Sequence, residues 1–128
     1  MAGDVLLDTN IVIAFFASDP PVLAHLQQSS FFIPAIVLGE LYAGARKSIR
    51  VADNLARIDA LIPPYVVLSC DTMTAQFYSI IKQDLRVKGR PIPENDIWIA
   101  AIARQYNLKL ISRDAHFSQV DSLLLEAW

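Results

Sequence analysis

Cysteine is almost absent from this sequence: Cys70 is the only one in 128 residues. A single cysteine cannot form an intramolecular disulfide, and it cannot build a zinc site from cysteine ligands. Histidine is nearly as scarce, and the spacing of His25 and His116 fits no metal-binding motif. We therefore interpret both histidines as structural or surface residues.

The sequence also lacks a long apolar segment. Residues 1–4 show neither the basic region nor the apolar stretch of a secretion signal. Residues 20–39 contain no Asp, Glu, Lys or Arg. They do contain polar side chains and prolines, and a hydrocarbon environment would leave their polar groups without hydrogen-bond partners. We expect a cytoplasmic protein with no membrane association.

An excess of positive charge is missing as well. The chain has 11 Lys and Arg against 13 Asp and Glu, a net charge of −2, which argues against nonspecific coating of nucleic acid. Its 54% content of hydrophobic residues excludes a disordered protein. No repeat or linker interrupts the sequence, so we predict one domain over residues 1–128.

Short apolar runs that alternate with helical patterns dominate what is present. The runs predict strands at residues 5–7, 31–33, 65–68, 109–112 and 123–125. Each run is continuously apolar, which is typical of a parallel sheet buried on both faces. The pattern predicts an α/β fold, a three-layer α/β/α domain with a central parallel sheet of about five strands.

Four carboxylates occupy positions where such a fold binds ligands. Asp8 and Asp114 each follow a strand at its carboxyl end, Glu40 lies about two turns into a helix, and Asp96 lies in the first turn of another helix. Singly, each has a simpler interpretation, such as capping for Asp8 or a solvated helix position for Glu40. Gathered at one edge they would repel one another unless a cation neutralised them. Oxygen donors without Cys or His favour Mg²⁺ or Mn²⁺.

Four segments around these carboxylates resemble a known family. They are VLLDTN at residues 5–10, GELYAG at 39–44, NDIWIAA at 95–101 and SRDAHF at 112–117. In this order they resemble the signature segments of PIN-domain nucleases, and more narrowly those of VapC-type toxins from toxin–antitoxin pairs. The resemblance covers essentially the whole chain and implies a PIN-like sheet with strand order 3-2-1-4-5.

The resemblance also implies a site. It gives metal-ligand roles to Asp8 and Asp96, and a ligand or orienting role to Glu40; Asp114 matches the fourth and most variable acidic position. We take these four as the catalytic residues that hold one or two Mg²⁺ or Mn²⁺ ions. The polar residues beside the first and fourth acids, expected to support a water or a phosphate oxygen, are Asn10 and Ser112.

The function implied is that of a metal-dependent endoribonuclease, the toxin of a type II toxin–antitoxin system that arrests translation. A metal polarises the scissile phosphate and activates water, so in-line hydrolysis of RNA would leave a 5′-phosphate and a 3′-hydroxyl. Expected partners are a VapB-like antitoxin, whose C-terminal segment covers the acidic pocket, and a second copy in a homodimer. Candidate RNA-binding residues, with solvated surface charge as the alternative, are Lys88, Arg90 and Arg113.

Two other Mg²⁺-binding α/β families remain open at this point. A phospho-receiver domain has adjacent acids after its first strand, whereas Thr9 and Asn10 follow Asp8 here. A haloacid-dehalogenase-like phosphatase has Asp-x-Asp there, and Asn10 replaces the second Asp. Incubation with acetyl phosphate or with labelled RNA, with and without Mg²⁺, distinguishes these readings from a nuclease and from a catalytically silent binding protein.

Overall fold

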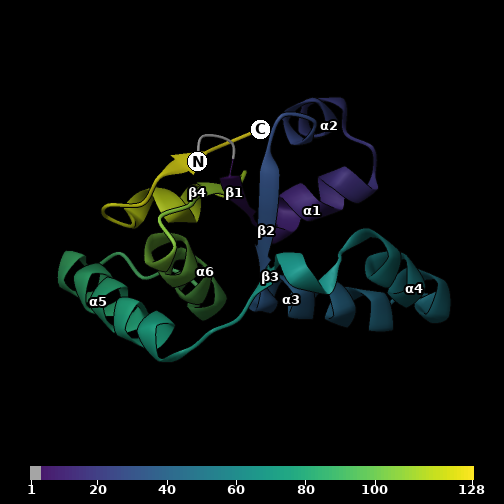
Figure 1. The fold of residues 1–128 in the computed structure, drawn as a ribbon. Helices are drawn as coiled ribbons and strands as arrows, with labels where there is room; N and C mark the ends of the chain where they lie inside the picture. Colours follow the sequence, from purple (N-terminus) through teal and green to yellow (C-terminus); the bar gives the residue numbers. More distant parts are fainter. Residues whose placement is uncertain (1–3) are drawn as a thin grey trace.

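A computed structural model describes residues 4–128, which contain a five-stranded sheet (Figure 1). All strand pairs are parallel and the order is β3-β2-β1-β4-β5. The strands are β1 Asp4–Leu7, β2 Ser30–Pro34, β3 Val67–Leu68, β4 Lys109–Ile111 and β5 Leu125–Glu126. The predicted α/β/α fold and its strand order are therefore confirmed. A receiver domain would have the order 2-1-3-4-5, so the sheet excludes that alternative.

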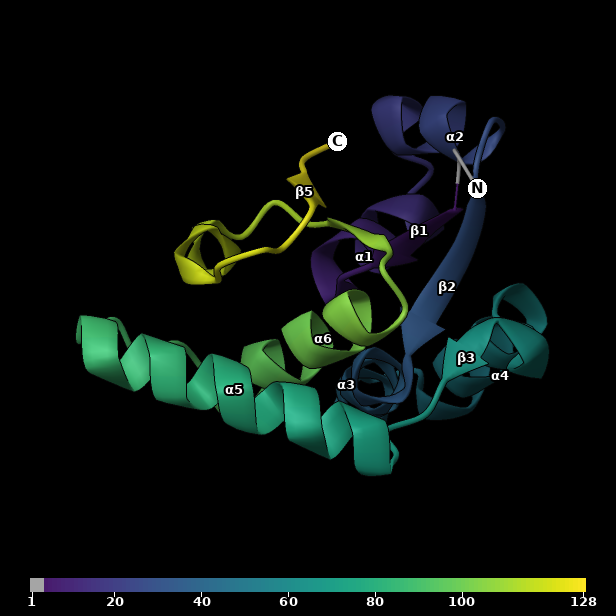
Figure 2. The ribbon, with the colours of Figure 1, turned by 60° about the vertical axis from the view of Figure 1, so that its left-hand side comes forward.

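Helices flank this sheet. Figure 1 shows α5 and α6 to one side of β2 and α1, α2 and α4 to the other, and Figure 2 shows α5 running alongside α6. The helices are α1 Thr9–Phe16, α2 Pro20–Leu26, α3 Ala35–Arg46, α4 Val51–Leu61, α5 Thr72–Lys88 and α6 Glu94–Gln105. Two short 3-10 helices, η1 Pro64–Val66 and η2 Ala115–Gln119, complete the elements.

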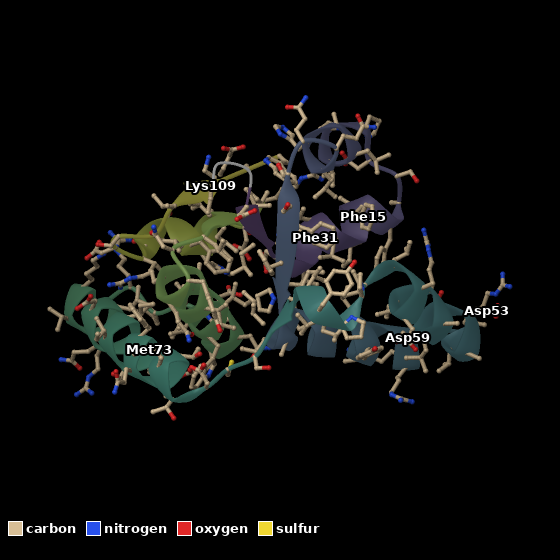
Figure 3. All side chains as sticks on the ribbon, viewed as in Figure 1. Phe15, Phe31, Asp53, Asp59, Met73 and Lys109 are labelled. Carbon is tan, nitrogen blue, oxygen red and sulfur yellow. The ribbon has the colours of Figure 1, made fainter. Side chains whose placement is uncertain are left out.

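The core lies where the central strands meet the helices. Leu6 and Leu7 of β1 are fully buried, and Leu7 is in register with Ile111 of β4. On the other side of β1, Phe31 of β2 packs near Phe15 of α1, with ring centroids 6.3 Å apart (Figure 3). Continuous apolar runs thus form strands that are covered on both faces, as expected for a parallel sheet.

Local signals fix several helix ends. The Asp19 side chain accepts a hydrogen bond from the Val22 amide and caps α2, and Asp71 forms a capping box with Thr74 at the start of α5. Gly89 ends α5 in the left-handed region at φ 67°, a conformation that glycine adopts without strain. Residues 89–93 then connect the end of α5 to the start of α6.

Two predicted strands differ from the structure. Residues 64–66 form η1 instead of strand, because two prolines precede Tyr65 and its side chain is exposed, and only Val67 and Leu68 pair with β2. The last strand is Leu125–Glu126, later than the predicted 123–125. Residues 1–3, on which the expectation of no secretion signal partly depends, lie outside the described residues. Within 4–128, no helix is both long and apolar enough to cross a membrane.

Candidate metal centre

Asp8 stands where β1 and β4 end side by side. Its amide donates to the carbonyl of Ile111 across 3.0 Å, which extends the pairing of the two strands by one residue. Its carboxylate accepts a 2.7 Å hydrogen bond from the hydroxyl of Ser112, the first residue after β4. Both side chains are buried, at 6% and 3% exposure. The Asp8 side chain does not cap α1, so the capping interpretation is wrong.

Asn10 and Ser112 connect the loop after β4 to the start of α1. The Asn10 amide nitrogen lies 3.4 Å from Asp8 Oδ2, and its oxygen accepts from the backbone amide of Arg113 across 3.2 Å. The Ser112 hydroxyl oxygen accepts from the Asp114 amide across 3.0 Å. The two predicted supporting residues therefore hold the backbone that carries Asp114.

Glu40 reaches the same region from the second turn of α3. Its Oε2 atom accepts a 3.1 Å hydrogen bond from the hydroxyl of Thr9, the first residue of α1. The contact joins residues 31 positions apart in the sequence. Thr9 was not among the predicted site residues, because nothing in the sequence indicates which helix faces the first turn of α1.

Asp96, Asp114 and His116 form the outer part of the cluster. Asp96 lies in the first turn of α6, and Asp114 precedes η2, where its Oδ1 accepts from the His116 amide. The His116 Nδ1 atom lies 3.1 Å from Asp96 Oδ2 and 3.1 Å from Asp114 Oδ1. One ligand atom from each of the three residues falls within a span of 4.8 Å. His116, interpreted from the sequence as a structural or surface residue, is exposed, and its ring also contacts two of the predicted acids.

The electrostatics of the cluster are those of concentrated negative charge. Burial is the largest cause that raises the pKa of Asp8, Glu40 and Asp96 above the ordinary carboxyl value. Neighbouring carboxylates raise the pKa further: Asp114 acts on Asp8 and Asp96, and Asp8 acts on Glu40 and Asp96. These mutual effects bring all four predicted acids into one electrostatic unit.

The donor set fits a hard divalent cation. It consists of carboxylate oxygens with hydroxyl and imidazole groups beside them, and the described residues provide no Lys or Arg ion pair to any of the four acids. Burial and, to a lesser extent, neighbouring carboxylates raise the pKa of Asp8, Glu40 and Asp96, so a bound cation would favour their ionised forms. The cluster can therefore hold a metal ion of the Mg²⁺ or Mn²⁺ type.

The three predicted RNA-binding residues are separated by the fold. Lys88 at the end of α5 pairs with Asp121 at 2.6 Å, and the Arg113 guanidinium donates to Asp19 and to the carbonyl of Trp128. Arg90 is exposed, and its side chain makes no hydrogen bond or ion pair within residues 4–128. Of these three residues, only Arg90 has a charged group without a hydrogen-bond or ion-pair partner in residues 4–128.

A groove adjoins the cluster on the Glu40 side. Its volume is about 230 Å³, and its walls come from α1, α3 and α4. Apolar side chains such as Ile13 and Leu41 line it, together with Arg57, whose guanidinium lies 5.5 Å from the centre of the Phe16 ring. Thr9 and Glu40 belong both to the groove and to the acidic cluster. A segment bound in the groove would therefore end beside the carboxylates.

Comparisons with known proteins agree with this geometry. A family model described as "PIN domain" matches residues 5–123. The chain is 35% identical to "Ribonuclease VapC2" of Haemophilus influenzae over 127 residues, and 32% identical to "tRNA(fMet)-specific endonuclease VapC" of Shigella flexneri, with 96% of each chain covered in both cases. Among solved structures, VapBC2 from Rickettsia felis bound to a promoter DNA fragment superimposes with a TM-score of 0.90 at 26% identity, covering 98% of both chains.

The match therefore extends from the first residues of β1, through all four acidic positions, to the segment before β5. The relatives share the length of this chain as well as its sequence, so the similarity is not confined to one motif. This chain belongs to the PIN domain family.

Proposed function

We propose that this protein is a divalent-metal-dependent endoribonuclease, the toxin component of a type II toxin–antitoxin pair that arrests translation by cutting RNA. The observation that carries the proposal is a cluster of four carboxylates to which the described residues provide no Lys or Arg ion pair, and burial raises the pKa of three of them, Asp8, Glu40 and Asp96. Full-length relatives named as VapC ribonucleases supply the reaction class.

Asp8, Asp96, Glu40 and Asp114 would hold one or two Mg²⁺ or Mn²⁺ ions in this proposal. A bound cation would polarise the scissile phosphate and would lower the pKa of a water molecule bound to it to near neutral. The 2.7 Å hydrogen bond from Ser112 orients the Asp8 carboxylate and favours its ionised form against the effect of burial, and the hydrogen bond from Thr9 does the same for Glu40. The products of in-line hydrolysis are a 5′-phosphate and a 3′-hydroxyl.

The substrate in this proposal is single-stranded or loop RNA, because the backbone must splay to bring one phosphate to a recessed carboxylate cluster. Arg90 follows the helix cap at Gly89 and is exposed four residues before Glu94, which begins α6. We assign it the principal phosphate contact. Lys88 and Arg113 would contribute only by leaving the ion pairs that they form with Asp121 and Asp19.

The protein partner in this proposal is a VapB-like antitoxin. Solved structures with high similarity are VapBC complexes, from Rickettsia felis and from Salmonella typhimurium, with TM-scores of 0.90 and 0.88. An apolar antitoxin segment would occupy the groove beside Glu40 and direct a basic side chain at the carboxylates. Growth arrest on expression, relieved by D8A or by co-expression of the cognate antitoxin, tests this part.

The proposal includes a homodimer, a single domain over residues 1–128 and a cytoplasmic location, where the RNA substrate is found. Apolar side chains that are exposed at seven-residue intervals on α5 offer one face for self-association: Met73, Ile80 and Val87. Sedimentation equilibrium of the purified chain at several concentrations measures the oligomeric state.

RNA cleavage by the purified chain tests the proposed activity. Labelled RNA should be cut with Mg²⁺ or Mn²⁺, remain intact with a chelator, and remain intact with the D8N and D96N variants. D84N removes an acidic charge on α5 that contributes to none of the raised pKa values of the cluster, and should cleave normally. Metal-independent cleavage, or wild-type rates in D8N, would contradict the proposal, and phosphate release from acetyl phosphate would favour the phosphatase alternative.

A further inference from the structure

The imidazole of His116 lies against the carboxylates that are proposed to bind metal. Its Nδ1 atom is 3.1 Å from one oxygen of Asp96 and 3.1 Å from one oxygen of Asp114, two residues contributed by different elements. The His116 side chain is half exposed, whereas that of Asp96 is only 15% exposed. Nδ1 is therefore the inward atom of the ring, and it faces the same point as both carboxylate oxygens.

These spacings match those between neighbouring ligands of one octahedral cation. Bonds of about 2.1 Å at right angles place adjacent ligand atoms about 3 Å apart. The two measured separations of 3.1 Å agree with this value, and all three ligand atoms lie within 4.8 Å of one another. Nδ1 and both oxygens are therefore placed where they could hold one cation together.

We propose that His116 supplies a nitrogen ligand to the metal ion, so that the centre of this protein is a mixed nitrogen and oxygen site that prefers Mn²⁺ to Mg²⁺. The inference rests on the proposed metal site and adds to it a ligand and a selectivity. The neutral ring binds the cation through the Nδ1 lone pair, and its proton is then carried by Nε2.

The preference for Mn²⁺ follows from the chemistry of the donor atoms. Mg²⁺ is bound by oxygen and retains several water ligands, and an imidazole nitrogen offers it little. First-row transition metals accept imidazole nitrogen readily. His116 therefore stabilises bound Mn²⁺ more than bound Mg²⁺, whereas the carboxylates of Asp96 and Asp114 contribute to both.

Pulsed EPR of the Mn²⁺-loaded, untagged protein tests the inference directly, because the spin of Mn²⁺ reports a bonded nitrogen as a hyperfine coupling. The chain contains only two histidines, so the assignment needs only two variants. H116Q removes the proposed ligand and leaves the backbone amide that Asp114 accepts from. H25Q is the matched control, since His25 stacks on Trp128 with ring centroids 4.6 Å apart.

The wild type and H25Q should show the nitrogen coupling, and H116Q should lose it. Mn²⁺ affinity, measured by titration of the free-ion EPR signal, should fall about tenfold in H116Q, while Mg²⁺ affinity from competition changes less than about twofold. Absence of the coupling in wild-type protein that has bound Mn²⁺, its persistence in H116Q, or equal weakening of both metals overturns the inference and leaves the proposed metal site standing. Failure of the wild type to bind Mn²⁺ at all overturns both.

Discussion

Removing the charge of Asp96 is expected to stabilise the metal-free protein, although Asp96 belongs to the proposed catalytic set. The ligand oxygens of Asp96 and Asp114 lie within 4.8 Å of one another. At an effective dielectric constant near 20, two charges at this distance repel by about 3 kcal/mol. Solvent reduces this value, because the Asp114 side chain is 34% exposed, and we expect a net gain of about 1–2 kcal/mol in D96N.

The gain in D96N depends on pH in a defined direction. Burial and the charges of Asp8 and Asp114 raise the pKa of Asp96 above its ordinary value of 3.8. Just above pH 3.8 the folded protein therefore keeps a proton that the unfolded chain has lost. The wild-type free energy of unfolding consequently falls as pH rises through this interval, until the folded carboxyl ionises. The free energy of unfolding of D96N does not fall in this way, because residue 96 no longer ionises. The difference in stability between D96N and the wild type is therefore small near pH 3 and reaches its full value near pH 7.

Thermal unfolding in the presence of a chelator measures the effect. D96N should melt about 3–8 °C above the wild type near pH 7, and the order should reverse when Mn²⁺ is added, because the cation binds only a folded site that retains its ligands. D84N, which removes an equal charge from a different helix, α5, should match the wild type in both conditions. A D96N protein that is less stable without metal, or that gains as much from Mn²⁺ as the wild type, refutes the reasoning.

Substitutions at three further positions test two single contacts and one strained backbone position. T9V removes the hydroxyl that donates to Glu40 at nearly constant volume, and should lower the metal-dependent cleavage rate about tenfold without changing the thermal midpoint by more than a few degrees. S112A removes the donor to buried Asp8, and urea titration should show a loss of about 1–2 kcal/mol in the free energy of unfolding. G89A forces an alanine into the left-handed region at φ 67°, although its Cβ atom would meet no neighbouring atom. Urea titration should therefore show a loss of about 1 kcal/mol in the free energy of unfolding for G89A and a smaller loss for G89N. Equal free energies for G89A and the wild type would count against strain at this cap.

The acidic positions could be predicted because two of them depend on strand order alone. Asp8 and Asp114 follow β1 and β4, and any fold that pairs these strands in parallel brings both to one edge. Continuous apolar runs indicated the strands, and the side chains of Asp19 and Asp71 cap the helices that begin directly after them. These features are local in the sequence, so they can be predicted without knowledge of tertiary contacts.

The features that could not be predicted depend on side-chain placement. His116 is twenty residues from Asp96 in sequence, and only the η2 turn directs its ring toward α6. Its position two residues after Asp114 was visible in the sequence, but it matches no ligand spacing that would have indicated metal binding. Likewise, the pairing of Lys88 with Asp121 depends on how the last loop folds against α5.

The chemical nature of the RNA ends tests the central claim most directly. If the carboxylate cluster cuts RNA by metal-assisted attack of water, every product carries a 5′-phosphate and a 3′-hydroxyl, and a substrate with a 2′-deoxy sugar at the cut site is still cleaved. Mass spectrometry of the fragments reads both properties in one measurement. A 2′,3′-cyclic phosphate, or loss of cleavage at the 2′-deoxy position, would mean that the RNA's own 2′-hydroxyl attacks and would contradict this account.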